Sequence, residues 1–195
     1  MERIMNGATS ILIFFLMYGT LAAQYNSYGP SQSHPFGRVN PAAQQQLSDY
    51  SEMIGTCDCI SQRRNQDGSW QDSIKMVWTF EYILNGFAIQ DKSYKEDNSY
   101  SSSIRMFNSD SSKWYVHYYS SNSVTPKLNT WAGRRSGNTI VLSMPQKAPN
   151  GMDGFSRLSF YDISSDGFKW IGEWHTPDTT IVYPFWKIEC LKRKE

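Results

Sequence analysis

The sequence predicts an all-β protein, an antiparallel up-and-down meander of about 8–10 strands that closes into a barrel. From residue 70 onward, apolar and polar residues alternate with a period of two in one short segment after another. That period is typical of strands with one buried face. Turn residues separate the segments at short intervals, which favours consecutive hairpins. Aromatic residues, which strands prefer, make up 15% of the chain. Closure into a barrel would remove exposed sheet edges.

The composition indicates one domain with tails and gives no sign of a charged partner. The chain has 195 residues, with 19 Lys and Arg against 18 Asp and Glu and a formal net charge of +1. Nucleic-acid-binding proteins usually carry a basic face and a high isoelectric point. We therefore expect no nucleic-acid partner.

Residues 1–23 predict a secretory signal peptide. Arg3 gives a positive start, residues 11–17 are apolar, and the small residues Ala22 and Ala23 suit a cleavage site. The apolar run is shorter than the ~20 residues that cross a bilayer comfortably. An uncleaved membrane anchor is the alternative. The mature protein is predicted to be secreted or periplasmic, with no membrane span after cleavage.

Residues 24–50 are predicted to be a polar, flexible tether. The segment is rich in Ser, Gln, Pro and Asn and poor in aliphatic residues. Such a composition buries too little apolar surface to offset the entropy of ordering. We expect at most a helical turn over residues 42–50, followed by the barrel domain over residues 51–195.

The strands of the domain are expected in order along the chain. The clearest spans 74–82, where large apolar side chains alternate with polar ones. Asn85-Gly86 follows and predicts a hairpin, because both central residues of a type I′ turn need positive φ. Pro184 marks a bulge or an unpaired edge in the last strand. Further strands are expected at 87–94, 104–107, 114–119, 128–132, 140–144, 158–160, 168–175 and 181–190.

Three cysteines predict one disulfide. Cys57 and Cys59 are separated by one residue, so in a strand they share a face and are poorly placed to bridge each other. A bridge from Cys57 or Cys59 to Cys190 would tie together the ends of the domain, and an exported protein permits it. A metal site is the alternative, but the Cys-x2-Cys spacing of structural zinc is absent and we expect no metal.

Gly68-Ser69-Trp70 resembles the Gly-x-Trp motif that opens the first strand of lipocalins. The hairpins that follow resemble the lipocalin and calycin group, including bacterial lipocalin-like domains of unknown function. The resemblance implies an eight-stranded barrel with a cavity for a small apolar ligand and Trp70 at its closed end. A basic residue near the last strand packs on this tryptophan in lipocalins, and Lys187 and Arg193 are the candidates here. The Thr-Asp-Tyr-like turn and C-terminal helix of lipocalins are missing.

Aromatic residues on the bulky strand faces are the candidate ligand-binding residues. Apolar walls with a few polar groups are the usual composition of small-molecule sites. The expected partner is a small apolar or aromatic ligand, with no cofactor. Asp91 and Arg105, although in strands, are expected to face solvent. The candidate lining residues are Trp78, Phe80, Tyr82, Trp114, Tyr118, Trp170 and Trp174.

No catalytic motif is present, including the Gly-x-Ser-x-Gly elbow, phosphate loops and the zincin motif. Glu173, His175 and His117 remain as candidates for acid–base chemistry. Each histidine alternates with the tryptophans of its own strand, which indicates a solvent-facing position. In the alternative interpretation the two histidines approach each other and, with Glu173, form a metal or acid–base site.

The sequence therefore favours an exported, non-enzymatic binding protein with a ligand in its barrel. One alternative is a secreted enzyme that acts on a carbohydrate or small metabolite through the His and Glu candidates. The other is a structural or protein-interaction domain at the cell surface, for which a large exposed aromatic patch would argue.

Overall fold

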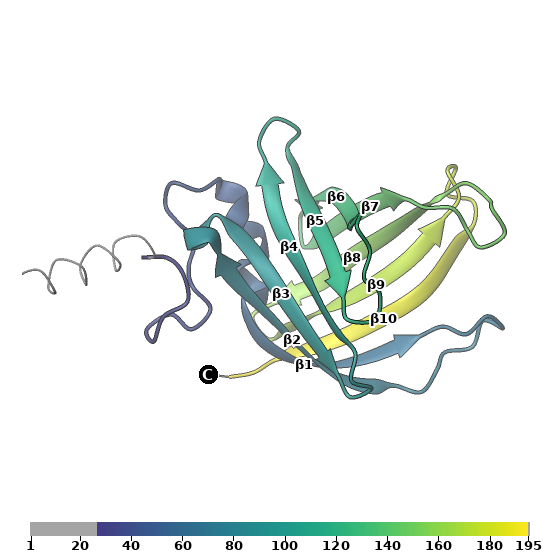
Figure 1. The fold of residues 1–195 in the computed structure, drawn as a ribbon, viewed down its shortest axis with the longest axis horizontal. Helices are drawn as coiled ribbons and strands as arrows, with labels where there is room; N and C mark the ends of the chain where they lie inside the picture. Colours follow the sequence, from purple (N-terminus) through teal and green to yellow (C-terminus); the bar gives the residue numbers. More distant parts are fainter. Residues whose placement is uncertain (1–26, 195) are drawn as a thin grey trace, which may run out of the picture.

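The computed structural model describes residues 27–194, and within them ten antiparallel strands form a closed barrel (Figure 1). Each strand pairs with its neighbours in the chain, and β1 closes the barrel against β10. The predicted all-β meander is confirmed, with ten strands where the resemblance implied eight. The strands are β1 (Gly55–Arg63), β2 (Ile74–Ile83), β3 (Ala88–Lys95), β4 (Tyr100–Asn108), β5 (Lys113–Ser120), β6 (Asn129–Ser136), β7 (Thr139–Pro145), β8 (Phe155–Ser164), β9 (Gly167–His175) and β10 (Val182–Lys192).

The predicted hairpin between β2 and β3 is present, but its turn is longer than a type I′ turn. Ile83 pairs with Ala88, and the short 3-10 helix η2 (Leu84–Gly86) lies in the connection. Three consecutive residues, 84–86, have positive φ. A Cβ on Gly86 would lie 2.5 Å from the Arg38 carbonyl oxygen. Glycine is required there because the N-terminal segment packs directly on the turn.

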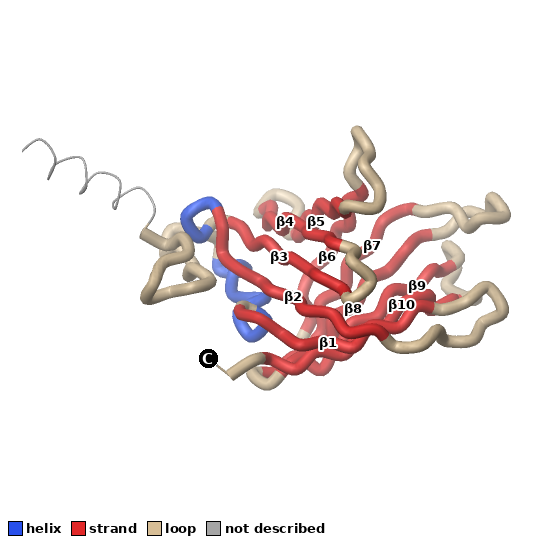
Figure 2. The backbone as a smooth tube through the Cα atoms, turned by 60° about the horizontal axis from the view of Figure 1, so that its bottom comes forward, coloured by secondary structure: helices blue, strands red, loops and turns tan. Residues whose placement is uncertain are grey.

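The part of the predicted tether that the structure describes lies against the barrel. A 3-10 helix, η1 (Gln45–Met53), sits with η2 at one end of the molecule (Figure 2). Its residues Leu47, Tyr50 and Met53 are almost completely buried. They recur every third residue, which places them on one face of a 3-10 helix. η1 therefore closes this end of the barrel. The predicted signal peptide lies outside the described residues.

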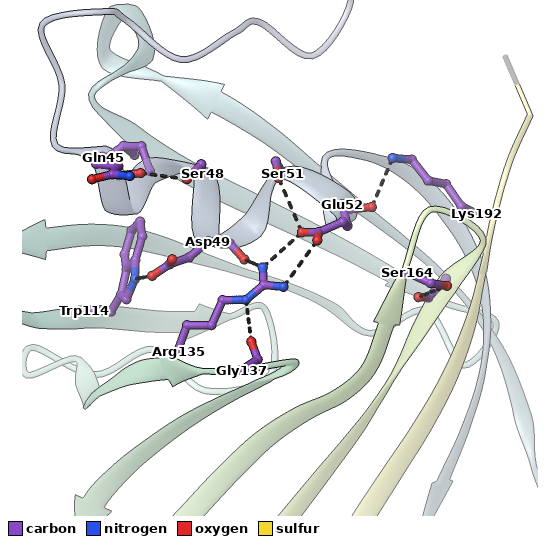
Figure 3. Close-up of polar contacts among 12 residues, drawn as sticks. Gln45, Ser48, Asp49, Ser51, Glu52, Trp114, Arg135, Gly137, Ser164 and Lys192 are labelled. Carbon is purple, nitrogen blue, oxygen red and sulfur yellow. Dashed lines mark hydrogen bonds and ion pairs between the residues drawn. The ribbon is translucent and has the colours of Figure 1, made fainter.

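Polar contacts fix η1 in place (Figure 3). Arg135 on β6 donates from both terminal nitrogens to the Glu52 carboxylate, at 3.0 and 3.2 Å, and to the Asp49 carbonyl. The Trp114 indole nitrogen donates to the Asp49 carboxylate at 2.9 Å, and Lys192 Nζ donates to the Glu52 carbonyl at 3.1 Å. The hydrogen bond from Arg135 holds the pKa of Glu52 below its usual range. η1 is thus tied to three strands, β5, β6 and β10.

A disulfide joins Cys59 on β1 to Cys190 on β10, which decides between the two predicted pairings. The two residues lie directly opposite each other in the register and are 131 residues apart in sequence. A loop of this length is worth about 4–5 kcal/mol in the chain-entropy model. Cys57 is a free, buried thiol whose pKa burial raises to about 11.

The Gly-x-Trp motif lies elsewhere than the lipocalin resemblance implied. Trp70 follows β1, forms a single bridge with Arg64, and lies in the β1–β2 connection at the end opposite η1. Its implied place at the closed end is therefore wrong, because a strand precedes the motif. Of the two basic candidates, Lys187 packs on the tryptophan, with Nζ 4.6 Å from the ring centroid. Arg193 instead pairs with Asp58 at 2.7 Å.

Candidate ligand-binding site

The half of the barrel away from η1 encloses a cavity of about 540 Å³. Small-molecule sites typically measure about 300–1,000 Å³. All ten strands contribute side chains to its lining. Arg63, Arg64, Gln71 and Gln146 line it at the end where β1 leads into β2, so this end is its mouth.

One wall of the cavity is a chain of three indole rings. The Trp78 and Trp170 centroids lie 6.4 Å apart, and those of Trp170 and Trp186 lie 5.1 Å apart. Both pairs are edge-to-face, at interplanar angles of 78° and 76°. Edge-to-face pairs are favourable beyond the area they bury. The three rings therefore form a fixed aromatic surface running from the barrel core toward the mouth.

Three of the indole N–H groups of this lining have partners inside the protein. Trp78 donates to Asp91 at 2.9 Å, and Trp186 donates to the Ser61 hydroxyl at 2.8 Å. Trp131, on β6, donates to the Ser156 hydroxyl at 2.7 Å. These side chains consequently offer a ligand the faces of their rings and no free hydrogen-bond donor.

The wall formed by β3 and β4 is polar. Asp91 and Arg105 are 3% and 2% exposed, so the expectation that they face solvent was wrong. Arg105 donates to Asp91, and its guanidinium carbon lies 5.0 Å from the Phe80 ring centroid. Burial of this charge is tolerated because the carboxylate neutralises it. The polar lining of β3 and β4 comprises Asp91, Ser93, Ser101, Ser103 and Arg105.

The seven aromatic candidates occupy three different places. Those that line the cavity are Trp78, Tyr118 and Trp170. Those buried in the core on the η1 side are Phe80, Tyr82 and Trp114. Tyr82, for example, donates to the Leu47 carbonyl, and burial raises its pKa to about 12. Trp174 is partly exposed and donates to the Gln146 carbonyl at 2.9 Å.

Several lining residues were missing from the sequence prediction. Phe185 enters the cavity at a bulge, since the β9–β10 register shifts between Pro184 and Trp186. The sequence predicted a bulge or an unpaired edge at Pro184, but it did not predict that Phe185 would point into the cavity. Leu158 and Phe160 alternate in the sequence, and this signal alone could have placed them inside. The further apolar lining residues that the prediction lacked are Met76, Val116, Trp131, Leu142, Trp186 and Ile188.

The three catalytic candidates do not form one cluster, because His117 lies apart from Glu173 and His175. His175 is 4% exposed rather than solvent-facing, because the Phe155 ring of β8 stacks on it at 5.1 Å. Its Nε2 lies 3.4 Å from Glu173. His117 pairs with the Thr130 hydroxyl at 2.9 Å, on a strand separated from β9 by three others. Within residues 27–194, no group of three His, Cys, Asp or Glu side chains is arranged to hold a metal ion.

Solved structures similar to this barrel include the following two. Rv2717c from M. tuberculosis aligns with a TM-score of 0.54 and 8% identity, covering 78% of this chain and 99% of that one. The S-type phycobiliprotein lyase CPES from Guillardia theta aligns with a TM-score of 0.50 and 10% identity, covering 76% and 92%. The fold is thus a lipocalin-like, calycin-type barrel. No family model matches the sequence, and no curated protein matches it either.

Proposed function

We propose that the protein is an exported, non-enzymatic binding protein that holds a small apolar or aromatic ligand in its barrel. The observation that carries this proposal is the cavity of about 540 Å³. It is closed toward η1 and lined at its other end by residues of the strand connections. A filled barrel of the same topology would need no such space, since protein interiors are normally close-packed.

The lining supports an aromatic or otherwise planar apolar ligand. Three indole rings form one wall, and the N–H groups of Trp78 and Trp186 are already hydrogen-bonded within the protein. Flat ring faces favour stacked or edge-to-face contacts with another ring. The serines of β3 and β4 would accept or donate hydrogen bonds to a polar substituent on the opposite side.

Export is supported by the disulfide between β1 and β10, since such bonds persist in oxidising compartments. The predicted signal peptide over residues 1–23 is consistent with it. No helix of the described part of the chain has the length and apolarity needed to cross a membrane.

The alternative enzyme function has less support. Glu173 and His175 alternate along β9 with Trp170, which lines the cavity. Successive side chains of a strand point to opposite faces of the sheet, so the acid–base pair lies on the outer face. A ligand inside the barrel would not reach it.

Native mass spectrometry of the mature protein, secreted by a homologous host, tests the proposal. We expect a discrete added mass that is lost on denaturation. A second measurement uses the fluorescent apolar probe N-phenyl-1-naphthylamine, which should bind the wild-type barrel. Leu158→Trp fills the cavity from within and should abolish probe binding, whereas Val141→Trp, on the outer face of β7, should not. An apo mass together with equal probe binding by both variants would contradict the proposal.

A further inference from the structure

We propose that the ligand carries an anionic group, and that Arg63 and Lys95 bind this group at the mouth of the cavity. The inference rests on the proposed function and names the class of ligand: an organic acid with an aromatic or apolar body. The body would lie along the indole wall, and the charge would remain at the open end.

The geometry centres on Trp186. The Arg63 guanidinium carbon lies 4.6 Å from its ring centroid, and Lys95 Nζ lies 4.3 Å from it. The ring itself is fixed by its hydrogen bond to Ser61 and its edge-to-face contact with Trp170. Two cations, one from β1 and one from β3, are therefore held against a residue that lines the cavity. Cation–π contact positions them but does not neutralise them.

Neither cation has a counter-charge. Within residues 27–194, no carboxylate oxygen lies within 4.0 Å of either side chain, and neither donates a side-chain hydrogen bond. Lys95 is nevertheless only 9% exposed. A buried charge without a partner is costly. A ligand anion between the two cations would remove this cost, and the site would then contribute to affinity.

The other two arginines that line the cavity, Arg64 and Arg105, have partners of their own. Arg105, deep in the barrel, is neutralised by Asp91. Arg64, at the mouth, donates to the Gly68 carbonyl at 2.7 Å and to the Pro184 carbonyl at 3.4 Å. Arg63 and Lys95, which have no such partner, lie beside Trp186, and the ion pair leaves the deep interior with no net charge to offer an anion.

Electrostatic surroundings agree with this placement. Burial, reinforced by the charge of Arg63, lowers the pKa of Lys95 to about 8, while Asp97 opposes the shift. Asp97 is exposed, and its carboxylate is engaged by the backbone N–H and hydroxyl of Ser99. It is thus poorly placed to act as the missing partner of Lys95.

A pair of probes with the same aromatic body isolates the charge. 1-Anilinonaphthalene-8-sulfonate is anionic, and N-phenyl-1-naphthylamine is the corresponding neutral amine. Fluorescence titrations of both probes would use the wild type, Arg63→Gln, Lys95→Gln and the control Lys92→Gln. Lys92 lies on the same strand as Lys95 but pairs with Glu81 on the outer face. Its substitution removes the same charge at a distance from the cavity.

We expect each mouth variant to bind the sulfonate about tenfold more weakly, the cost of one lost charged hydrogen bond. Binding of the neutral amine should be unchanged, and Lys92→Gln should behave as wild type with both probes. Equal losses for both probes, or no loss for either, would overturn the anion site while leaving the cavity function in place. Failure of the wild type to bind either probe would overturn both proposals. Circular dichroism of each variant confirms that the barrel is folded.

Discussion

Replacing Asp91 by Asn should destabilise the barrel by about 3–5 kcal/mol, the usual cost of breaking a buried ion pair. The pair is inside the barrel, with side chains 3% and 5% exposed for Arg105 and Asp91. The substitution removes the charge and leaves the guanidinium facing the Tyr50 and Phe80 rings, at 5.3 and 5.0 Å. Both cation–π contacts are already present in the wild type, so they do not compensate for the lost ion pair. The Trp78 indole can still donate to the new amide oxygen, which keeps the loss within this range.

A double-mutant cycle separates the pair from its surroundings. Arg105→Met preserves much of the side-chain length and should cost a similar amount, because it leaves Asp91 charged and buried. The variant carrying both substitutions should lose at least about 2 kcal/mol less than the sum of the two single losses, since residues in contact couple. Glu81→Gln is the control: its partner Lys92 is 36% exposed, and surface pairs contribute at most about 1 kcal/mol.

Urea unfolding at pH 7, followed by tryptophan fluorescence and circular dichroism, measures the free energy of each variant. The disulfide must stay oxidised in all of them, so that the unfolded states are comparable. Coincident transitions by the two probes would support a two-state analysis. The reasoning would be refuted if each single variant lost no more than Glu81→Gln and the two losses were additive.

Three further predictions concern the disulfide, η1 and the mouth. Cys190→Ser should lower the free energy of unfolding by about 4–5 kcal/mol, seen as an earlier urea midpoint, and an unchanged midpoint would show that the bridge adds nothing. Met53→Ala should cost about 2–5 kcal/mol by the same assay, whereas a detached tether would show no effect. Binding of the anionic probe should weaken as pH rises through about 8, the pKa of Lys95, which faces Arg63 and Asp97. The affinity for the anionic probe is highest while Lys95 is protonated. The affinity for the neutral probe should not change with pH.

The fold could be predicted from the alternation of apolar and polar residues along the strands. A strand with this period of two can bury its large residues only by turning one face inward. Trp78 and Phe80 face inward as predicted. The N-terminal segment was different. Averaged over residues 24–50 its composition is polar, yet Leu47 and Tyr50 pack on the barrel, together with Met53 just beyond the segment at the same spacing of three. Their burial depends on a matching surface formed by distant strands, which no local pattern reveals.

The inward position of Asp91 on the polar wall of the cavity could have been predicted from the sequence. The predicted Asn85-Gly86 turn sets Ile83 opposite Ala88, and the observed longer turn has the same register. Counting back along the two strands then places Asp91 opposite Phe80. Directly opposed residues of antiparallel strands point to the same face. The assumption that charged residues face solvent overrode this register, and it failed because the charge of Asp91 is neutralised by Arg105 on the next strand.

The size of the side chains across neighbouring strands explains why space remains at all. Trp78 on β2 pairs with Ser93 on β3, and Asp91 pairs with Ser103 on β4. The inward positions beside these larger side chains are therefore taken by small ones, which leaves space inside the barrel. Ser103→Leu should therefore fill part of the cavity. We expect it to weaken binding of N-phenyl-1-naphthylamine while leaving the thermal midpoint unchanged or higher, since cavity filling commonly stabilises at the expense of function. A fall in stability of about 1–3 kcal/mol would instead be the signature of overpacking. That result would mean that the space beside Ser103 is already occupied by protein, and the same strand would then have no room for a ligand.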